Sequence, residues 1–258
     1  MVAAIVVFAV AQGGGGGGGP LGAIAKAAEV TQREPGGRAT LTSTITSSAM
    51  PEALTEHGSM IFDSTGRARG AMTVKVPGTE GEGHEAQVTT IVVGTKSYTA
   101  PESEGARVPD GKKWIGIDLA DANKEVESSS PGEDSPQEGL KVLEKVRDAK
   151  EIGREEIRGV PTTRYRGTLP TATEVFGAKA HFSAPEVEVW IDARDRVRRM
   201  HLVISGSLGE SKESTTTAMT IEFVSFGQVP KIEAPDPSEV FDATHQVEAQ
   251  VQSAAEGN

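Results

Sequence analysis

The chain has 258 residues, of which 36% are hydrophobic and 24% are charged, enough for one sizeable domain with a packed core or for two small ones. Its formal net charge is -11, and the basic residues are scattered among 37 acidic ones, so the clustered Lys and Arg side chains of a nucleic-acid binder are missing. The absence of cysteine excludes disulfides, thiolate catalysis, CxxC zinc sites and lipid-modified cysteine.

The N-terminal segment has features of an export signal. Residues 1–11, MVAAIVVFAVA, form an apolar run that is too short to span a bilayer and ends in the small-x-small pattern of a signal-peptidase site. The basic residues that usually precede such a run are absent. We therefore predict a signal-like or anchor segment over residues 1–12. The alternatives are a short uncleaved anchor, a start that lies inside the real signal, and a buried strand.

A run of seven glycines follows, Gly13 to Gly19. It satisfies the GxGxxG pattern of dinucleotide sites only because every residue is glycine, there is no GK[ST] sequence, and Pro20 separates it from the helical pattern of Leu21 to Val30. Glycine-rich runs behave as flexible spacers. Residues 13–20 are therefore predicted to be a tether, followed by a helix from Leu21 to Thr31.

From residue 38 onward, apolar and polar residues alternate in short segments, which is the pattern of strands that bury one face. The loops between these segments are too short for crossover helices, so the strands should form an antiparallel meander. Before residue 120 the predicted strands are 38–47, 58–62, 68–76, 87–93, 96–100 and 113–119. After residue 150 they are 152–157, 162–169, a hairpin over 187–205, and 219–223.

One helix interrupts the strands. Ser135 at the N-cap, Pro136 at the first helical position and Glu138 form a capping box, and Leu140, Leu143 and Val146 recur on one stripe. Residues 236–239, DPSE, predict a last short turn of helix. From residue 243 to 258 the chain is polar and is predicted to be a tail outside the domain.

The hairpin reads VEVWIDARDRVRRMHLVIS and contains many reactive side-chain types. Its alternation places Val189 and Leu202 on the apolar side and Trp190 and His201 on the polar side. The loop 193–196 has no Asn-Gly or Gly-Gly pair, so a loop of three to five residues fits better than a two-residue turn. This pattern favours one wall of a larger structure over a reactive site.

About ten strands and two or three helices predict an α+β fold. A sheet this long, with too few helices to cover it as a layer, should curl around them and leave a cleft.

The sequence offers little support for catalysis. The five histidines do not stand at metal-ligand spacings, and no serine lies in a GxSxG or SxxK motif. Trp190 is interpreted as a half-exposed cross-strand neighbour rather than a cofactor platform, and Asp192 and Asp195 as residues of a solvated bend. We expect no enzyme activity, no catalytic residues, no metal and no cofactor.

The apolar side of the strands is more informative, because methionine and tyrosine join the aliphatic residues there. Methionine makes an adaptable lining that tolerates a flexible apolar ligand. An ordinary filled core explains the pattern equally well. If the face is a cavity, its predicted lining residues are Leu41, Met60, Phe62, Met72, Val74, Tyr98, Tyr165, Val189, Leu202 and Ile221.

Several phrases, in order, resemble a known family. They are GKKWIGIDL (111–119), SPQEGLKVLEKV (135–146), IRGVPTTRYRGTL (157–169), VEVWIDARDRVRRMHL (187–202) and IEFVSFGQVPKIEAP (221–235). Together they resemble the actinobacterial envelope lipoproteins related to LppX, LprA, LprF and LprG, in the wider LolA-like superfamily. The resemblance covers residues 21–242. It implies a half-open, strongly curved antiparallel β-barrel with helices on the concave face, and an apolar cavity for acyl chains of lipids or lipoproteins.

The chain departs from this family at one position. Such lipoproteins carry a lipid-modified cysteine just before the tether, where this chain has Gln12. The resemblance therefore predicts an exported, non-enzymatic lipid binder or carrier at the cell envelope or secreted, anchored by other means or released. We expect a monomer that meets the membrane surface and no nucleic acid. The alternative is an envelope sensor or protein-interaction domain with the same fold and a filled core.

Overall fold

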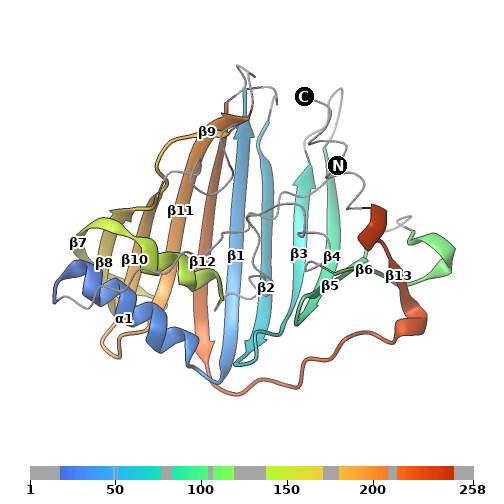
Figure 1. Ribbon diagram of the computed structural model, residues 1–258, viewed down its shortest axis with the longest axis horizontal. Coiled ribbons are helices and arrows are strands. Elements are labelled where there is room, and N and C mark those ends of the chain that lie inside the picture. Colours follow the sequence, from blue (N-terminus) through green and yellow to red (C-terminus); the bar gives the residue numbers. More distant parts are fainter. Residues whose placement is uncertain are drawn as a thin grey trace.

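The computed structural model describes residues 18–48, 50, 52–76, 83–103, 107–118, 138–170, 180–208 and 214–246. Within these ranges the protein forms one 13-stranded, curved sheet with an α-helix and three short 3-10 helices (Figure 1). The outermost strands of the sheet do not pair with each other, so the sheet is not closed. This confirms the predicted α+β class and the half-open antiparallel sheet.

The first half of the chain contributes α1 and the strands on one side of the sheet. Their bounds are α1 Pro20–Gln32, β1 Gly36–Ser47, β2 Leu54–Asp63, β3 Ala68–Val76, β4 His84–Val93, β5 Lys96–Pro101, the 3-10 helix η1 Pro109–Gly111 and β6 Trp114–Asp118.

The second half contributes the remaining strands. Their bounds are the 3-10 helix η2 Glu138–Lys145, β7 Arg147–Ile157, β8 Val160–Thr168, β9 Ala180–Phe182, β10 Glu186–Asp192, β11 Val197–Leu208, β12 Thr215–Phe226, the 3-10 helix η3 Pro237–Glu239 and β13 Val240–Asp242. Every predicted strand is present. The two that the sequence did not indicate, β9 and β13, have three residues each, too few for a visible alternation.

The strands are ordered β13-β6-β5-β4-β3-β2-β1-β12-β11-β10-β8-β7, and β9 pairs with β11. Consecutive strands therefore form two antiparallel meanders, which join where β1 pairs with β12. The parallel pair in this order is β13 with β6. The chain returns to that edge after β12 through a long segment that crosses the lower end of the sheet in Figure 1.

The helices α1 and η2 lie in front of the strands from β7 to β12 in Figure 1. Ile24, Ala27 and Ala28 of α1 and Leu140 and Leu143 of η2 are buried in one cluster with apolar residues of these strands. We call this side of the sheet the helix face and the other side the opposite face. That the helix face is the concave one stays a prediction.

The second predicted helix differs from the expectation. Residues 135–137 lie outside the described residues, and the described part, η2, is a 3-10 helix rather than an α-helix. Its apolar residues Leu140, Leu143 and Val146 recur every three positions, which matches the three residues per turn of a 3-10 helix. The backbone N–H of Val146 donates to Leu143 O, and β7 begins one residue later.

A second, smaller core lies on the opposite face, beneath the C-terminal segment. Ile91, Ala100, Trp114 and Ile232 are buried there. The packed part of the chain also extends slightly beyond the predicted boundary at residue 242, because Thr244 is buried and its Oγ1 accepts a hydrogen bond from the backbone N–H of Asp118. Asp236 caps the predicted last helical turn by accepting a hydrogen bond from Ser238 N, which confirms η3.

The edge strand β7 is irregular. Its pairing with β8 shifts register twice, and its backbone has positive φ at Asp148 (52°) and Gly153 (148°). Its residues from Arg147 to Glu156 are almost all exposed, and many are charged. Such bulges bend a strand and interrupt its hydrogen-bonding row.

Candidate ligand-binding face

The register of the sheet fixes which side chains share the helix face, because directly opposed residues of an antiparallel pair point to the same side. One row of ten residues crosses the sheet without a break, from β7 to β5. In strand order it is Glu151, Tyr165, Val189, Met200, Ile221, Leu41, Gly58, Met72, Val88 and Pro101. A neighbouring row on the same face is Gly167, Val187, Leu202, Met219, Ser43, Glu56, Val74 and Ala86.

The two halves of the helix face differ in burial. On β10 and β11, Val189 and Leu202 are 0% and 1% exposed, beneath α1 and η2. On β1 to β4, Ala39, Phe62, Ala68 and Val92 still belong to the packed core, whereas five other apolar residues of these strands are only half-buried. The most extensive contacts of α1 with the sheet are those with β7, β10 and β11. We call this half-buried group the open patch; it consists of Leu41, Met60, Met72, Val74 and Val88.

Most of the predicted lining residues therefore share one face, but they have different surroundings. Phe62, Val189 and Leu202 are enclosed in the packed core, and Phe62 meets Phe223 edge-to-face at 5.7 Å. Tyr165 and Ile221 lie in the covered half of the face. Leu41, Met60, Met72 and Val74 lie in the open patch, so these four predicted residues are half-buried rather than enclosed.

Tyr98 does not lie on the face where it was predicted. It opposes Ile91 across the β4–β5 pair and packs against the second core, so it lies on the opposite face and not on the predicted cavity wall. The strand β5 alternates as expected, but its inward residue on the helix side is Ser97, which opposes Val92. On this strand the apolar side, with Tyr98 and Ala100, faces the second core, and the side toward the helices carries Ser97 and Thr99.

One carboxyl group, which the sequence reasoning missed, lies on the helix face beside the open patch. Glu56 lies between Ser43 and Val74 in its row, and burial raises the pKa of its carboxyl above the ordinary value. No hydrogen bond or ion pair connects it to any of the described residues. The signal was visible in the sequence, because Glu56 is in phase with Gly58, Met60 and Phe62.

The opposite face of the covered half carries a layer of paired charges. Both oxygens of Glu188 are engaged, since Arg164 binds one and Arg166 binds the other, with 2.8 Å from Arg166 Nε to Glu188 Oε1. Glu222 accepts in the same way from Arg199 and Arg158. We call these residues, together with Trp190 and Glu155, the arginine layer.

Trp190 is buried in the arginine layer, which corrects its interpretation as a half-exposed residue. It is 4% exposed, and the guanidinium carbons of Arg164 and Arg199 lie 4.9 and 5.2 Å from its ring centre. Its Nε1–H donates to Glu155 Oε2 over 2.8 Å. Cross-strand pairing was predicted correctly, but the long arginine side chains on the neighbouring strands cover the ring.

The pKa values of the acids in the arginine layer follow from this pairing. Burial acts to raise the pKa of Glu188, but the hydrogen bonds from Arg164 and Arg166 outweigh it and hold the pKa below its ordinary value. For Glu222, burial is likewise outweighed by Arg199 and Arg158. Both carboxylates are therefore held ionised, which suits a structural role rather than proton transfer.

The hairpin loop has the predicted length, four residues from 193 to 196, between β10 and β11. Asp192 is not part of a solvated bend, because it is 6% exposed and its carboxylate accepts from the backbone N–H groups of Arg194 and Arg196 and from the Arg196 side chain. Asp195 is partly exposed, and its carboxylate lies 2.6 Å from Lys26 Nζ of α1. His201 Nδ1 lies 2.9 Å from Oγ1 of its cross-strand neighbour Thr220.

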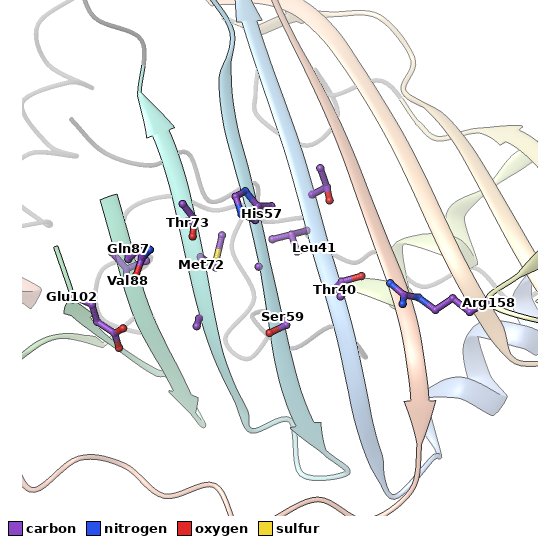
Figure 2. A pocket seen from close by; sticks show the side chains of 13 residues that line it. Thr40, Leu41, His57, Ser59, Met72, Thr73, Gln87, Val88, Glu102 and Arg158 are labelled. Carbon is purple, nitrogen blue, oxygen red and sulfur yellow. The ribbon is translucent and has the colours of Figure 1, made fainter. Parts of the chain in front are cut away.

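A hollow of about 500 Å³ lies behind the open patch, on the opposite face (Figure 2). Figure 2 shows the strands in the reverse left-to-right order of Figure 1 with β1 still pointing upward, so it views the sheet from the side away from α1. The hollow is lined mainly by polar side chains of β1 to β4, with two predicted residues, Leu41 and Met72, among the lining. The lining residues are Thr40, Leu41, Thr42, His57, Gly58, Ser59, Ala71, Met72, Thr73, Gln87, Val88, Glu102 and Arg158.

Within the described part of the chain, no group of three or more His, Asp or Glu side chains could hold a metal ion. None of the helices described there is long and apolar enough to cross a membrane.

Comparison with known proteins supports the resemblance seen in the sequence. A family model described as "LppX_LprAFG lipoprotein" matches residues 57–229, a span of more than half of the chain. The match includes β3 to β12 in full, and with them most of the open patch and the hairpin wall.

A Streptomyces griseus protein, described as an uncharacterized 31.2 kDa protein in the rplA-rplJ intergenic region, is 29% identical over 154 residues. That alignment covers 51% of this chain and 48% of the relative, so the chain spans about half the length of the curated relative it matches. Among solved structures, the Mycobacterium tuberculosis lipoprotein LppX is similar, with 16% identity, a TM-score of 0.46, and coverage of 83% of this chain and 97% of that one. LprF from Mycobacterium bovis is similar at 12% identity and a TM-score of 0.44, over 84% and 96% of the two chains.

Proposed function

The chain belongs to the LppX_LprAFG lipoprotein family, and on that premise we propose that it is an exported, non-enzymatic binder or carrier of a lipid or another long apolar molecule. We place the ligand on the open patch. The packed core under α1 and η2 borders this site on one side.

The observation that carries this proposal is the half-buried state of the open patch. Its five apolar residues lie on the same face as the packed core but are only half-buried, and α1 and η2 lie in front of the strands from β7 to β12 (Figure 1). Each methylene group of a ligand that leaves water for such a surface contributes about 0.8 kcal/mol. Met60 and Met72 have flexible side chains that can adapt to an acyl chain of variable shape.

The location of the protein forms part of the proposal. A lipoprotein family implies an exported protein of the cell envelope. We propose that residues 1–12 direct export, that residues 13–20 are a tether, and that residues 21–242 form the lipid-binding domain; residues 1–17 lie outside the described residues. A monomer that takes its ligand from a membrane surface or from lipoprotein acyl chains fits this arrangement.

Native mass spectrometry of protein purified from a lipid-containing host tests the proposal. The expected result is a species heavier than the polypeptide, which loses the extra mass when the sample is delipidated. Met72→Asp should remove the extra mass, because a charged side chain would stand in the open patch. Ala71→Asp is the matched control, since Ala71, the residue before Met72 in β3, is exposed on the opposite face. Identical masses before and after delipidation would favour a filled core and a sensor or interaction domain.

A further inference from the structure

We propose that Glu56 is the polar recognition residue of the open patch, and that the ligand carries a hydrogen-bond donor beside its apolar chain, so that it is a hydroxylated neutral lipid rather than a free fatty acid. This inference rests on the proposed function and adds the chemical class of the ligand to it.

The position of Glu56 within the patch supports this role. On β2 it is flanked on the same face by Leu54 and Gly58, and across the strands by Ser43 and Val74. Gly58 has no side chain of its own; a Cβ there would lie 2.8 Å from Cγ of Met72, so the methionine occupies the space beside the glycine. Glu56 therefore stands in the row beside the one that holds Met72, at one end of the open patch.

The surroundings of Glu56 contain no described partner. Its same-face neighbours in the adjacent rows are Leu41, Gly58, Met72 and Val88 on one side, and Ile45 and Leu54 on the other. On β4, the titratable residue on this face is His84, which lies at the start of the strand and is exposed. A half-buried carboxyl without a partner loses hydration and receives nothing in return. Such a group destabilises the unliganded fold, and a bound molecule that donates a hydrogen bond to it would offset this cost.

The chemistry of a carboxylate limits what that partner can be. When ionised it only accepts hydrogen bonds, so a ligand hydroxyl fits it, whereas a ligand carboxylate brings a second negative charge. Like charges that meet at a binding surface cost several kcal/mol. The open patch should therefore accept a chain that ends in hydroxyl groups and reject the same chain when it ends in a carboxylate.

A pair of probes with the same acyl chain tests this inference. Monooleoylglycerol and oleate are used at pH 8 to displace Nile red, an uncharged apolar dye, from the full-length protein. The wild-type protein should bind monooleoylglycerol at least about tenfold more tightly than oleate. Glu56→Gln should tighten oleate binding and reduce this ratio to about twofold or less, because the carboxamide is uncharged and has both donors and acceptors.

The control is His57→Gln, which changes the next residue of β2, an exposed residue on the opposite face, and should leave the ratio unchanged. A wild-type protein that binds both probes equally, or a ratio that survives in Glu56→Gln, would overturn the inference and leave the proposed function standing. If neither Nile red nor either probe binds the wild-type protein, the proposed function fails and this inference fails with it.

Discussion

The two halves of the sheet are built differently although they share one register. From β7 to β12 the sheet is reinforced on both sides, by α1 and η2 on the helix face and by the arginine layer on the opposite face. From β1 to β4 the helix face carries the half-buried open patch, and the opposite face carries the hollow. Strand alternation decides which side chains share a face, and covering elements decide whether that face becomes core or binding surface.

The strongest test of this difference introduces the same charged residue, aspartate, into each half of the sheet at positions of one cross-sheet row. Val189 and Met72 belong to the same cross-sheet row, but Val189 is 0% exposed and Met72 is half-buried. We expect Val189→Asp to lower the free energy of unfolding by on the order of 4 kcal/mol, because its carboxylate would be buried without a partner. Met72→Asp should cost about 1 kcal/mol.

Urea denaturation followed by circular dichroism measures both values. Equal losses for the two variants would mean that the two halves are equally covered and would remove the distinction.

The next test concerns the arginine layer. Glu188→Gln removes the charge that holds Arg164 and Arg166, and it should lower the free energy of unfolding by about 2 kcal/mol at pH 7. The pKa of Glu188 is lowered in the folded protein, so its contribution is present above the ordinary value of 4.5 and is lost as the pH falls through the lowered pKa. The difference between variant and wild type should therefore shrink in acid.

Glu186→Gln on the same strand is the control. Its carboxylate is exposed and 3.5 Å from Arg166, so the change should stay within about 0.5 kcal/mol. If the two variants behave alike at every pH, the covered half does not depend on its charged layer.

A smaller effect, of opposite sign, is expected in the open patch. Glu56→Gln should raise the melting temperature at pH 7, because burial raises the pKa of Glu56 and the ionised form destabilises the fold. As the pH falls through the raised pKa the wild-type carboxyl is protonated, and below the ordinary value of 4.5 the advantage of the variant should vanish. Differential scanning calorimetry between pH 4 and 8 measures this, with the exposed Glu85→Gln as a control.

A melting temperature that falls in Glu56→Gln at pH 7 would show that Glu56 supports the fold, and the open patch would then resemble the covered half.

The smallest effect is expected where α1 meets the hairpin loop. Asp195→Asn removes the ion pair with Lys26, but both side chains are exposed, so the change should stay within about 0.5 kcal/mol. Asn also tolerates the positive φ of 57° at this position. A larger loss in thermal denaturation would mean that surface charge, rather than apolar packing, holds the helix on the covered half.

Much of this architecture could be predicted from the sequence, because alternation depends only on local geometry. Eleven of the strands and the length of the hairpin loop follow from it. Tyr98 could not be placed, because Ile232, which helps to form the second core on its face, is more than a hundred residues away. The burial of Trp190 escaped prediction for a similar reason, since its covering arginines come from β8 and β11.

The candidate site was predicted only in part. Methionines in phase with the strands indicated an apolar face, but phase does not report whether a helix covers it, so Val189 and Met72 appeared equivalent. Glu56 is in phase with Met60, and a charged residue at such an inward position is a local sign of a binding surface rather than a core.

An unclosed sheet exposes two rows of unpaired backbone groups, which can recruit strands from other molecules. The bulges and charges of β7 interrupt one row, and at the other end β13 offers only three residues. Neither edge is a good template for a further strand, so copies of the chain should not polymerise edge to edge. The protein can therefore keep an accessible apolar surface on an open sheet without forming fibres through its edge strands.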